Sequence, residues 1–282
     1  MAPAPPSLDR ETAVAIDLAR RAGAIVLRYR SPDLEVSHKA HDEPVTRADR
    51  EANDLIVAGL RAAFPDDAVL SEESAAVGEY QTAARAWMVD PLDGTRDYVR
   101  GLPGFAVMIG LCLEGRPSLG VVYQPLGDML YRAARGEGAF AEEGGATRQL
   151  RVAATRDPRG CRLVSSASHR MTTIDRVRAA LAIDDEISLG SVGLKLGLIA
   201  RAERDLYVNP EGFCKLWDSC APGLILTEAG GRLTDVRGRP LDYRHADVRH
   251  EGGLLGSNGL IHDAVVAALA PLFPPPTIRI RR

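Results

Sequence analysis

The chain of 282 residues lacks the features that mark several large classes of protein. It has no apolar run close to the roughly 20 residues that a membrane-spanning helix needs. Its formal net charge is −3, which gives no electrostatic basis for broad binding to nucleic acid or to a membrane surface. The sequence also contains no internal repeat. We therefore expect neither a nucleic acid nor a membrane as its partner.

The cysteines lack the spacing of a metal-binding or redox motif. They form no C-x-x-C pair, and no histidine stands at a zinc-finger distance from them. We interpret them as reduced thiols and expect a cytoplasmic protein. The opening segment MAPAPPS is short, proline-rich and uncharged, which predicts a disordered leader rather than a signal peptide. The four cysteines are Cys112, Cys161, Cys214 and Cys220.

The composition that remains, 45% hydrophobic and 26% charged, is ordinary for a globular protein with an ample core. Periodicity predicts helices over residues 7–30, 46–64, 173–181, 192–202, 218–229 and 261–272. Strands are predicted at 69–70, 87–90, 106–113, 119–123, 129–134, 162–165, 187–189, 206–208, 233 and 254–255, with a glycine-rich loop over 136–145. The segment TRDPRG marks a boundary. We predict an α+β domain with a metal-binding core over residues 1–155 and an α/β domain over 156–282.

The most informative segment is WMVDPLDGT at residues 87–95. Its first residues predict a buried strand, and the proline cannot continue the strand's hydrogen-bond ladder, so the chain should turn there. Asp90 and Asp93 would then be held near each other at the strand end. Gly94 allows the backbone to approach a ligand closely, and Thr95 can begin a short helix. Paired carboxylates beside a helix N-terminus are typical of a site for Mg²⁺ and phosphate.

The same residue types also occur in ordinary turns, so this segment alone leaves both interpretations open. Its spacing argues against one rival mechanism. Phosphatases that form an aspartyl-phosphate carry D-x-D-G-T, with the two carboxylates two positions apart. Here the carboxylates are three positions apart, which suits metal binding better than covalent catalysis.

Other acidic residues could contribute to such a site. Glu72 and Glu73 end a predicted strand, either as a solvated pair or as the source of a third carboxylate. Asp218 starts a predicted helix, where it is an N-cap or a ligand to a second cation. Asp49 stands three residues after a threonine, as in a capping box. Alternatively, it bonds to Thr95 in a dyad that orients and deprotonates an attacking water.

Two basic residues in the second half also have two interpretations. His169 follows a serine-rich strand end and is either structural or a donor to phosphate. Lys195 lies in the apolar helix SVGLKLGLIA, which is a costly place for a charge. It must either extend to solvent or meet an anion, and we favour the anion.

Taken together, these elements resemble the inositol monophosphatase superfamily of Mg²⁺-dependent, lithium-sensitive phosphatases. The similarity extends over residues 13–272 and implies a layered αβαβα sandwich. The elements that carry it, in the expected order, are PVTRAD at 44–49, Glu72-Glu73, DPLDGT at 90–95 and the segment from Trp217-Asp218 to Ala229-Gly230-Gly231.

The second half is most similar to the 3′(2′),5′-bisphosphate nucleotidases, including the bacterial branch linked to sulfate assimilation. This implies adenosine 3′,5′-bisphosphate, or its sulfated relative, as the substrate. Glu211 favours another subfamily, because it stands seven residues before Asp218, where inositol monophosphatases carry an acid that contacts inositol; it could also be an ordinary loop acid. The nucleotidase-like segments are Ser168-His169, SVGLK at 191–195, CKLWDSCAP at 214–222 and GGRLTD at 230–235.

The resemblance implies a set of metal ligands. Glu72, Asp90 and the carbonyl of Leu92 would hold a first Mg²⁺. Asp90, Asp93 and Asp218 would hold a second. A third, weaker ion would lie mainly on Glu72 and water, which gives two to three ions in all. Crowded carboxylates repel one another unless divalent cations compensate them. We also count Glu72 among the catalytic residues.

It implies roles in substrate binding and catalysis as well. A metal-activated water, oriented by Thr95 and Asp49, would attack the phosphorus in line and release the 3′-phosphate. The amides of Gly94 and Thr95 would bind the reacting phosphate. Lys195, helped by His169, would hold the 5′-phosphate, because a second dianion needs its own positive partner.

Two rival functions remain open. One is an inositol or sugar monophosphatase of the same superfamily, with a fructose bisphosphatase less similar. The other is an inactive regulator that binds metal or nucleotide, against which the complete set of acids argues. We expect either a monomer or a homodimer.

Overall fold

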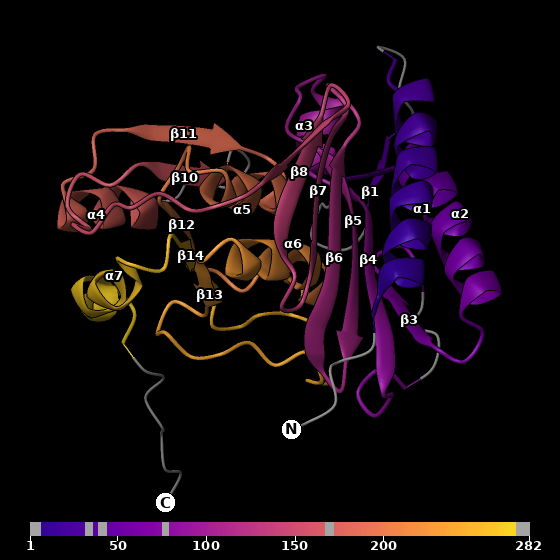
Figure 1. The fold of residues 1–282 in the computed structure, drawn as a ribbon. Helices are drawn as coiled ribbons and strands as arrows, with labels where there is room; N and C mark the ends of the chain where they lie inside the picture. The colour runs from indigo at the N-terminus through magenta and orange to yellow at the C-terminus, as the bar shows by residue number, and fades with distance from the viewer. Residues whose placement is uncertain (1–6, 32–35, 39–43, 75–78, 167–171, 275–282) are drawn as a thin grey trace, which may run out of the picture.

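Helices and sheets alternate in five layers. The computed structural model describes residues 7–31, 36–38, 44–74, 79–166 and 172–274. From one side to the other, the layers are a helix pair, a seven-stranded sheet, a second helix pair, a five-stranded sheet and a third helix pair (Figure 1). This order confirms the αβαβα sandwich predicted from the sequence. In the described part of the chain, no helix is both long enough and apolar enough to cross a membrane.

The outer helix pair and a small hairpin come from the start of the chain. The bounds are α1 Asp9–Arg28, α2 Arg47–Ala63, β1 Val36–His38 and β2 Pro44–Thr46. Both helices bury aliphatic side chains against the seven-stranded sheet. The Thr46 hydroxyl caps α2 by accepting from the Ala48 N–H at 3.1 Å. Gly59 lets the two helices approach closely, because a Cβ there would collide with Leu18.

The seven-stranded sheet lies in chain order and is antiparallel except for its first pair. Its strands are β3 Ala68–Ser71, β4 Arg85–Asp93, β5 Ala106–Leu113, β6 Arg116–Gln124, β7 Met129–Ala134, β8 Gly138–Glu143 and β9 Ala146–Gln149. The predicted loop over 136–145 is wrong, because it contains β8. Ala139 and Ala141 alternate into the core, while Gly136 and Gly144 take positive φ in the flanking turns. The glycines therefore mark the turns and not an irregular loop.

The five-stranded sheet is mixed, with the order β11-β10-β12-β14-β13. Its strands are β10 Leu163–Ser166, β11 Glu186–Leu189, β12 Leu206–Asn209, β13 Arg232–Thr234 and β14 Leu254–Ser257, and its outer helices are α4 Thr172–Leu181 and α7 His262–Leu269. The first three strands in this order are parallel, and β14 is antiparallel to both neighbours. The chain passes from one sheet to the other between Gln149 and Leu163. The division into two domains at residue 155 stays a prediction.

The middle helices lie between the two sheets and are buried on most sides. They are α5 Val192–Ala200 and α6 Leu216–Glu228. Two glycines let α6 rest almost on the backbone of the seven-stranded sheet. A Cβ on Gly110 would lie 2.6 Å from Cys220 Sγ, and one on Gly120 would collide with the Ala221 carbonyl. These glycines therefore set the distance between the seven-stranded sheet and α6, the helix that carries Asp218.

We expect Gly110→Ala to destabilise the protein by about 1–3 kcal/mol, the usual cost of overpacking a core. It should also weaken divalent-cation binding, because the added methyl group pushes against α6. Thermal unfolding and Mn²⁺ titration measure the two effects. Gly127→Ala is the control, since Gly127 has a φ of +102° and no atom near the added Cβ. That variant should cost roughly 1–2 kcal/mol of backbone strain and leave Mn²⁺ affinity unchanged. Equal Mn²⁺ affinities for the two variants would contradict this account.

Candidate metal centre

Strand β4 is irregular between Asp90 and Asp93. Asp90 pairs with Met108 and Asp93 pairs with Ala106, so three steps along β4 oppose two along β5. The extra residue makes a β-bulge, which locally re-aims side chains. The prediction that the strand ends at Pro91 is therefore wrong, because the strand continues to Asp93. A bulge, rather than a chain end, brings the two aspartates together.

Gly94 follows with a φ of +89°, in the left-handed region that favours glycine. It also has no room for a side chain, because a Cβ would collide with the Gly104 carbonyl and lie 3.1 Å from the Ser191 nitrogen. The chain then enters α3 (Thr95–Val99), the short helix predicted from the sequence. Gly94 thus places the end of β4 against the segment that begins α5.

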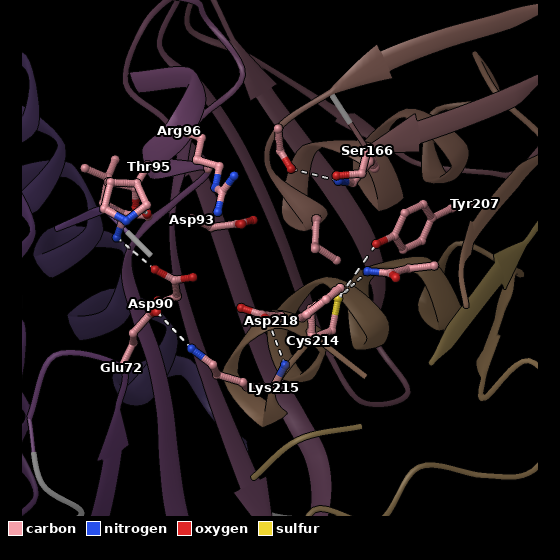
Figure 2. A pocket seen from close by; sticks show the side chains of 18 residues that line it. Glu72, Asp90, Asp93, Thr95, Arg96, Ser166, Tyr207, Cys214, Lys215 and Asp218 are labelled. Atoms are coloured by element: carbon pink, nitrogen blue, oxygen red, sulfur yellow. Dashed lines mark hydrogen bonds and ion pairs between the residues drawn. The ribbon is translucent and has the colours of Figure 1, made fainter. Parts of the chain in front are cut away.

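Three carboxylates gather at this junction. Oxygen atoms of Asp90, Asp93 and Asp218 all lie within 4.8 Å of one another. They line a cavity of about 160 Å³ between the two sheets. Figure 2 shows them facing a common space, with Glu72 at its edge and Arg96 beside Asp93. The structure thus brings Asp90 and Asp218 together although they are 128 residues apart in the sequence.

Two of these carboxylates each use one oxygen to accept a backbone N–H. Asp90 Oδ1 accepts from the Leu92 nitrogen at 2.9 Å. Asp218 Oδ2 accepts from the Lys215 nitrogen at 2.7 Å. The predicted N-cap at Asp218 is wrong, because α6 begins at Leu216 with Lys215 as its N-cap; Asp218 is the third helical residue, and its carboxylate accepts the N-cap's backbone N–H. In both residues the second carboxylate oxygen is left for another partner. Capping and cation binding are therefore compatible in the same side chain.

Asp93 is held in the same way, but from the other half of the chain. Its Oδ2 accepts from the Ser191 hydroxyl at 2.5 Å and from the Gly193 nitrogen at 3.0 Å. Ser191 is itself the N-cap of α5 and accepts from the Leu194 nitrogen at 3.1 Å. The N-terminus of a helix favours negative charge. Asp93 is consequently anchored to α5 through one oxygen and presents the other to the cavity.

Burial and mutual repulsion disfavour the ionised forms of the three carboxylates. Burial, followed by the charges of neighbouring acids, raises the pKa of Asp90 and Asp218 well above the ordinary value. Burial also raises the pKa of Asp93, although the hydrogen bonds from Ser191 and Gly193 oppose it. These carboxylates, each with an oxygen to spare, are hard ligands of the kind that Mg²⁺ prefers. The donor set therefore fits a divalent cation.

Asp49 makes the contacts of both its predicted interpretations, while its role toward an attacking water stays a prediction. Its Oδ2 accepts from the Thr46 nitrogen and hydroxyl, at 2.7 and 2.6 Å, which completes a capping box. Its Oδ1 lies 3.2 Å from the Thr95 hydroxyl, which can donate instead to the Leu92 carbonyl at 2.9 Å. Burial raises the pKa of Asp49 to about 6, against the effect of the Thr46 hydrogen bonds. Asp49 and Thr95 thus form a pair beside the three-carboxylate cluster.

Glu72 lines the same cavity and forms an ion pair. It follows β3, and its Oε1 lies 3.3 Å from Lys215 Nζ (Figure 2). Leu92 also lines the cavity. The predicted ligands Glu72 and Leu92 are therefore placed beside the cluster, and their roles as ligands stay predictions.

The predicted substrate contacts are less uniform. Lys195 lines the cavity but is buried, and its ammonium donates to the Leu189 and Gly190 carbonyls at 3.2 and 2.7 Å. Glu211 is half-buried, with its backbone nitrogen donating to an asparagine side chain. His169 lies outside the described residues. The roles of all three in substrate binding stay predictions.

Several residues at the cavity were not predicted. Arg96 directly follows the DGT motif, and a cation in that position was a readable signal. Lys215 and Cys214 lie in the segment that carries the resemblance, but nothing local showed that they face the cavity. The others come from strand ends and a loop of the other sheet, which only the tertiary structure brings here. The unpredicted lining residues include Arg96, Ser166, Tyr207, Asn209, Phe213, Cys214 and Lys215.

Fold and site together define the class: a layered αβ protein with a carboxylate cluster suited to divalent cations at the junction of its two sheets. The chain belongs to the inositol monophosphatase family, whose model matches residues 7–271. This confirms the resemblance seen in the sequence and places the protein in a family of phosphatases.

Relatives within the family differ in activity. The chain is 38% identical over 229 residues to the 3′(2′),5′-bisphosphate nucleotidase CysQ of Escherichia coli, which covers 80% of this chain and 91% of the relative. It is 33% identical over 261 residues to a histidinol-phosphatase of Mycobacterium tuberculosis, covering 91% and 96%. The solved structure of the suppressor protein SuhB from Bartonella henselae superimposes with a TM-score of 0.81 at 30% identity, covering 93% and 98%. The comparisons thus show the family, and the members named here differ in the activity that their names give.

We expect Mg²⁺ to stabilise the protein more at high pH than at low pH. A carboxyl group whose pKa is raised on folding stabilises the fold below its unfolded pKa, and this contribution is lost as the pH rises through the folded value. For Asp49 that interval runs from 3.8 to about 6, and the pKa values of Asp90, Asp93 and Asp218 are raised in the same direction.

Ion-free protein should therefore lose stability as the pH rises over this interval, and Mg²⁺ should compensate the ionised carboxylates. Thermal unfolding with Mg²⁺ or with chelator, at about pH 5 and about pH 8, measures the effect. An increase in Tm from Mg²⁺ that is no larger at the higher pH would contradict the expectation.

Proposed function

We propose that the protein is a Mg²⁺-dependent phosphomonoesterase that removes the 3′-phosphate of adenosine 3′,5′-bisphosphate or of its sulfated relative. The carboxylate cluster of Asp90, Asp93 and Asp218 carries the reaction type. The identity of 38% to a bisphosphate nucleotidase supports the substrate class. A net charge of −3 and a site lined with acids favour a small phosphorylated substrate presented together with cations.

The metal ligands follow from the geometry together with the family. Asp90, Asp93 and Asp218 would hold one ion, and Glu72, Asp90 and the Leu92 carbonyl would hold another. When bound, Mg²⁺ neutralises charge on the phosphate and makes water a better nucleophile. The hydrogen bonds to backbone N–H groups fix three of the carboxylates before any ion arrives.

Thr95 and Asp49 would orient the attacking water and receive its proton. The Thr95 hydroxyl sits between the Asp49 carboxylate and the Leu92 carbonyl, at 3.2 and 2.9 Å. A pKa of about 6 makes Asp49 a stronger base than an ordinary carboxylate, yet leaves it ionised at neutral pH. Its capping box holds it rigidly behind Thr95.

The opposite wall would bind the rest of the nucleotide. Lys195 has three N–H groups, of which backbone carbonyls accept two, so one can be offered to the 5′-phosphate. Phe213 lines the cavity with 49% of its surface exposed, and an aromatic ring is a good platform for a nucleobase. Arg96 provides a further positive charge in the cavity lining.

One observation bears on the rival substrate. Glu211 holds the sequence position of the inositol-contacting acid, and its backbone nitrogen is tied to Asn209 at 3.2 Å. Among the described residues, the cavity lining includes Asn209 and Phe213, on either side of Glu211 in the chain, but not Glu211 itself. We therefore favour the nucleotide over inositol phosphate.

We expect phosphate release from adenosine 3′,5′-bisphosphate to exceed that from inositol 1-phosphate by at least about tenfold in kcat/KM, the ratio that 1.4 kcal/mol gives. The assay compares the two substrates side by side, with Mg²⁺ and with chelator. Faster turnover of inositol 1-phosphate would overturn the substrate class. No Mg²⁺-dependent release from either substrate would favour a phosphatase with a different phosphomonoester substrate or the inactive regulator.

The control for this assay is Asp93→Asn, which removes one carboxylate charge from the cluster. It should abolish turnover while the protein remains folded by circular dichroism. Undiminished turnover at saturating Mg²⁺ would show that Asp93 is not a metal ligand.

We expect Lys195→Ala to raise KM for adenosine 3′,5′-bisphosphate much more than KM for inositol 1-phosphate, because only the nucleotide carries a second phosphate. Steady-state kinetics with both substrates measures this. Thermal unfolding controls for the loss of the bonds to Leu189 and Gly190. Equal increases for both substrates would remove Lys195 from 5′-phosphate binding and leave it a structural role.

A further inference from the structure

Lys215 places an ammonium group inside the metal centre. Its Nζ lies 3.3 Å from Glu72 Oε1, and the two side chains are only 19% and 18% exposed. The same residue donates its backbone N–H to Asp218, at 2.7 Å. Its ammonium also lies 5.4 Å from the centroid of the Trp217 ring, a cation–π distance. Lys215 is thus held between two predicted metal ligands.

We propose that Lys215 is a resident cation of the metal centre. It neutralises Glu72 when no divalent ion is bound, and it competes with any ion that would bind through Glu72. By this competition it makes binding of a divalent ion through Glu72 weaker than the acids alone would allow. The inference rests on the proposed function, because it requires that the centre binds divalent ions.

The first argument is electrostatic. Asp90, Asp93 and Asp218 share one space, and the charge of Glu72 acts on each of them. The ammonium of Lys215 offsets part of this repulsion, and it does so without an ion having to bind from solution. A divalent ion that approaches Glu72 must then either displace the ammonium or bind next to a like charge.

The second argument is geometric. Among the described residues, a second buried ammonium near the cluster, that of Lys195, donates to the Leu189 and Gly190 carbonyls, and no ion pair joins it to Glu72. Lys215 reaches Glu72 from the first residue before α6 (Figure 2). Its backbone is fixed by Asp218 and its ammonium by the Trp217 ring, so its position is set by α6 itself.

Lys215→Met tests the proposal, with Lys215→Arg as the matched variant that keeps the charge. Methionine preserves the apolar stem and the contact with the indole. The probe is Mn²⁺ alone, titrated into substrate-free protein and followed by electron paramagnetic resonance and calorimetry. We expect the Kd of the weakest Mn²⁺ site to fall about tenfold or more in Lys215→Met, because the substitution removes a unit positive charge a few ångströms from the ion. The same Kd should change little in Lys215→Arg.

Ion-free stability supplies a second readout. Without the ammonium, less positive charge offsets Glu72 beside the cluster, so ion-free Lys215→Met should have a lower Tm than the unmutated protein. Added Mn²⁺ should close this gap, because the ion replaces the missing charge. A gap that persists at saturating Mn²⁺ would show that Lys215 acts only in packing.

The double variant Glu72→Gln/Lys215→Met isolates the pair. In the Glu72→Gln background the methionine substitution should leave Mn²⁺ affinity nearly unchanged, since its effect acts through Glu72. An unchanged Mn²⁺ Kd in Lys215→Met alone would overturn the proposal. A raised Kd would also overturn it, because Lys215 would then be positioning Glu72 for the ion. Failure of the unmutated protein to bind Mn²⁺ would instead overturn the proposed function.

Discussion

Like charges crowded into one small space are the constraint around which this protein is arranged. Asp90, Asp93 and Asp218 are brought within 4.8 Å of one another, where burial and mutual repulsion disfavour their ionised forms. The fold meets this constraint by giving each carboxylate a donor. One oxygen accepts a backbone N–H or a hydroxyl, and the other is left for a cation. The hydrogen bonds fix the direction of the acids, and the remaining oxygens suit a divalent cation that would supply the missing charge.

This arrangement also joins the two halves of the chain. Asp93 comes from the seven-stranded sheet, yet it binds Ser191 and Gly193 at the start of α5, whose chain neighbours form the five-stranded sheet. Gly94 permits the close contact on which this depends, because any side chain there would strike the Gly104 backbone. The bond that orients a candidate ligand is therefore also a bond between the halves. A rearrangement of one half against the other would disturb the site.

Much of the fold and site could be predicted because the informative features are local. The DPLDGT segment, the capping box of Asp49 and the helix periodicity can all be read within a few residues, and the family match confirms the resemblance to which they contribute. The bulge in β4 could not be predicted, because it depends on pairing with β5. The strand β8 was hidden by its glycine-rich turns. Ser191 and Lys215 have ordinary local sequences, and only tertiary contacts bring Ser191 to Asp93 and the Lys215 ammonium to Glu72.

The contact of α6 with Gly110 and Gly120 has a consequence for how such a site can diversify. Asp218 lies on α6, which packs directly on the sheet that carries Asp90 and Asp93, so the relative positions of all three acids are fixed by this one packing contact. Most of the opposite wall, including Ser166, Tyr207 and Phe213, comes from strand ends and a loop of the other sheet. Substitutions there can reshape what the cavity accepts without moving the acids. Because one sheet holds the acids and another holds most of the opposite wall, relatives of this protein can share a reaction while they differ in substrate.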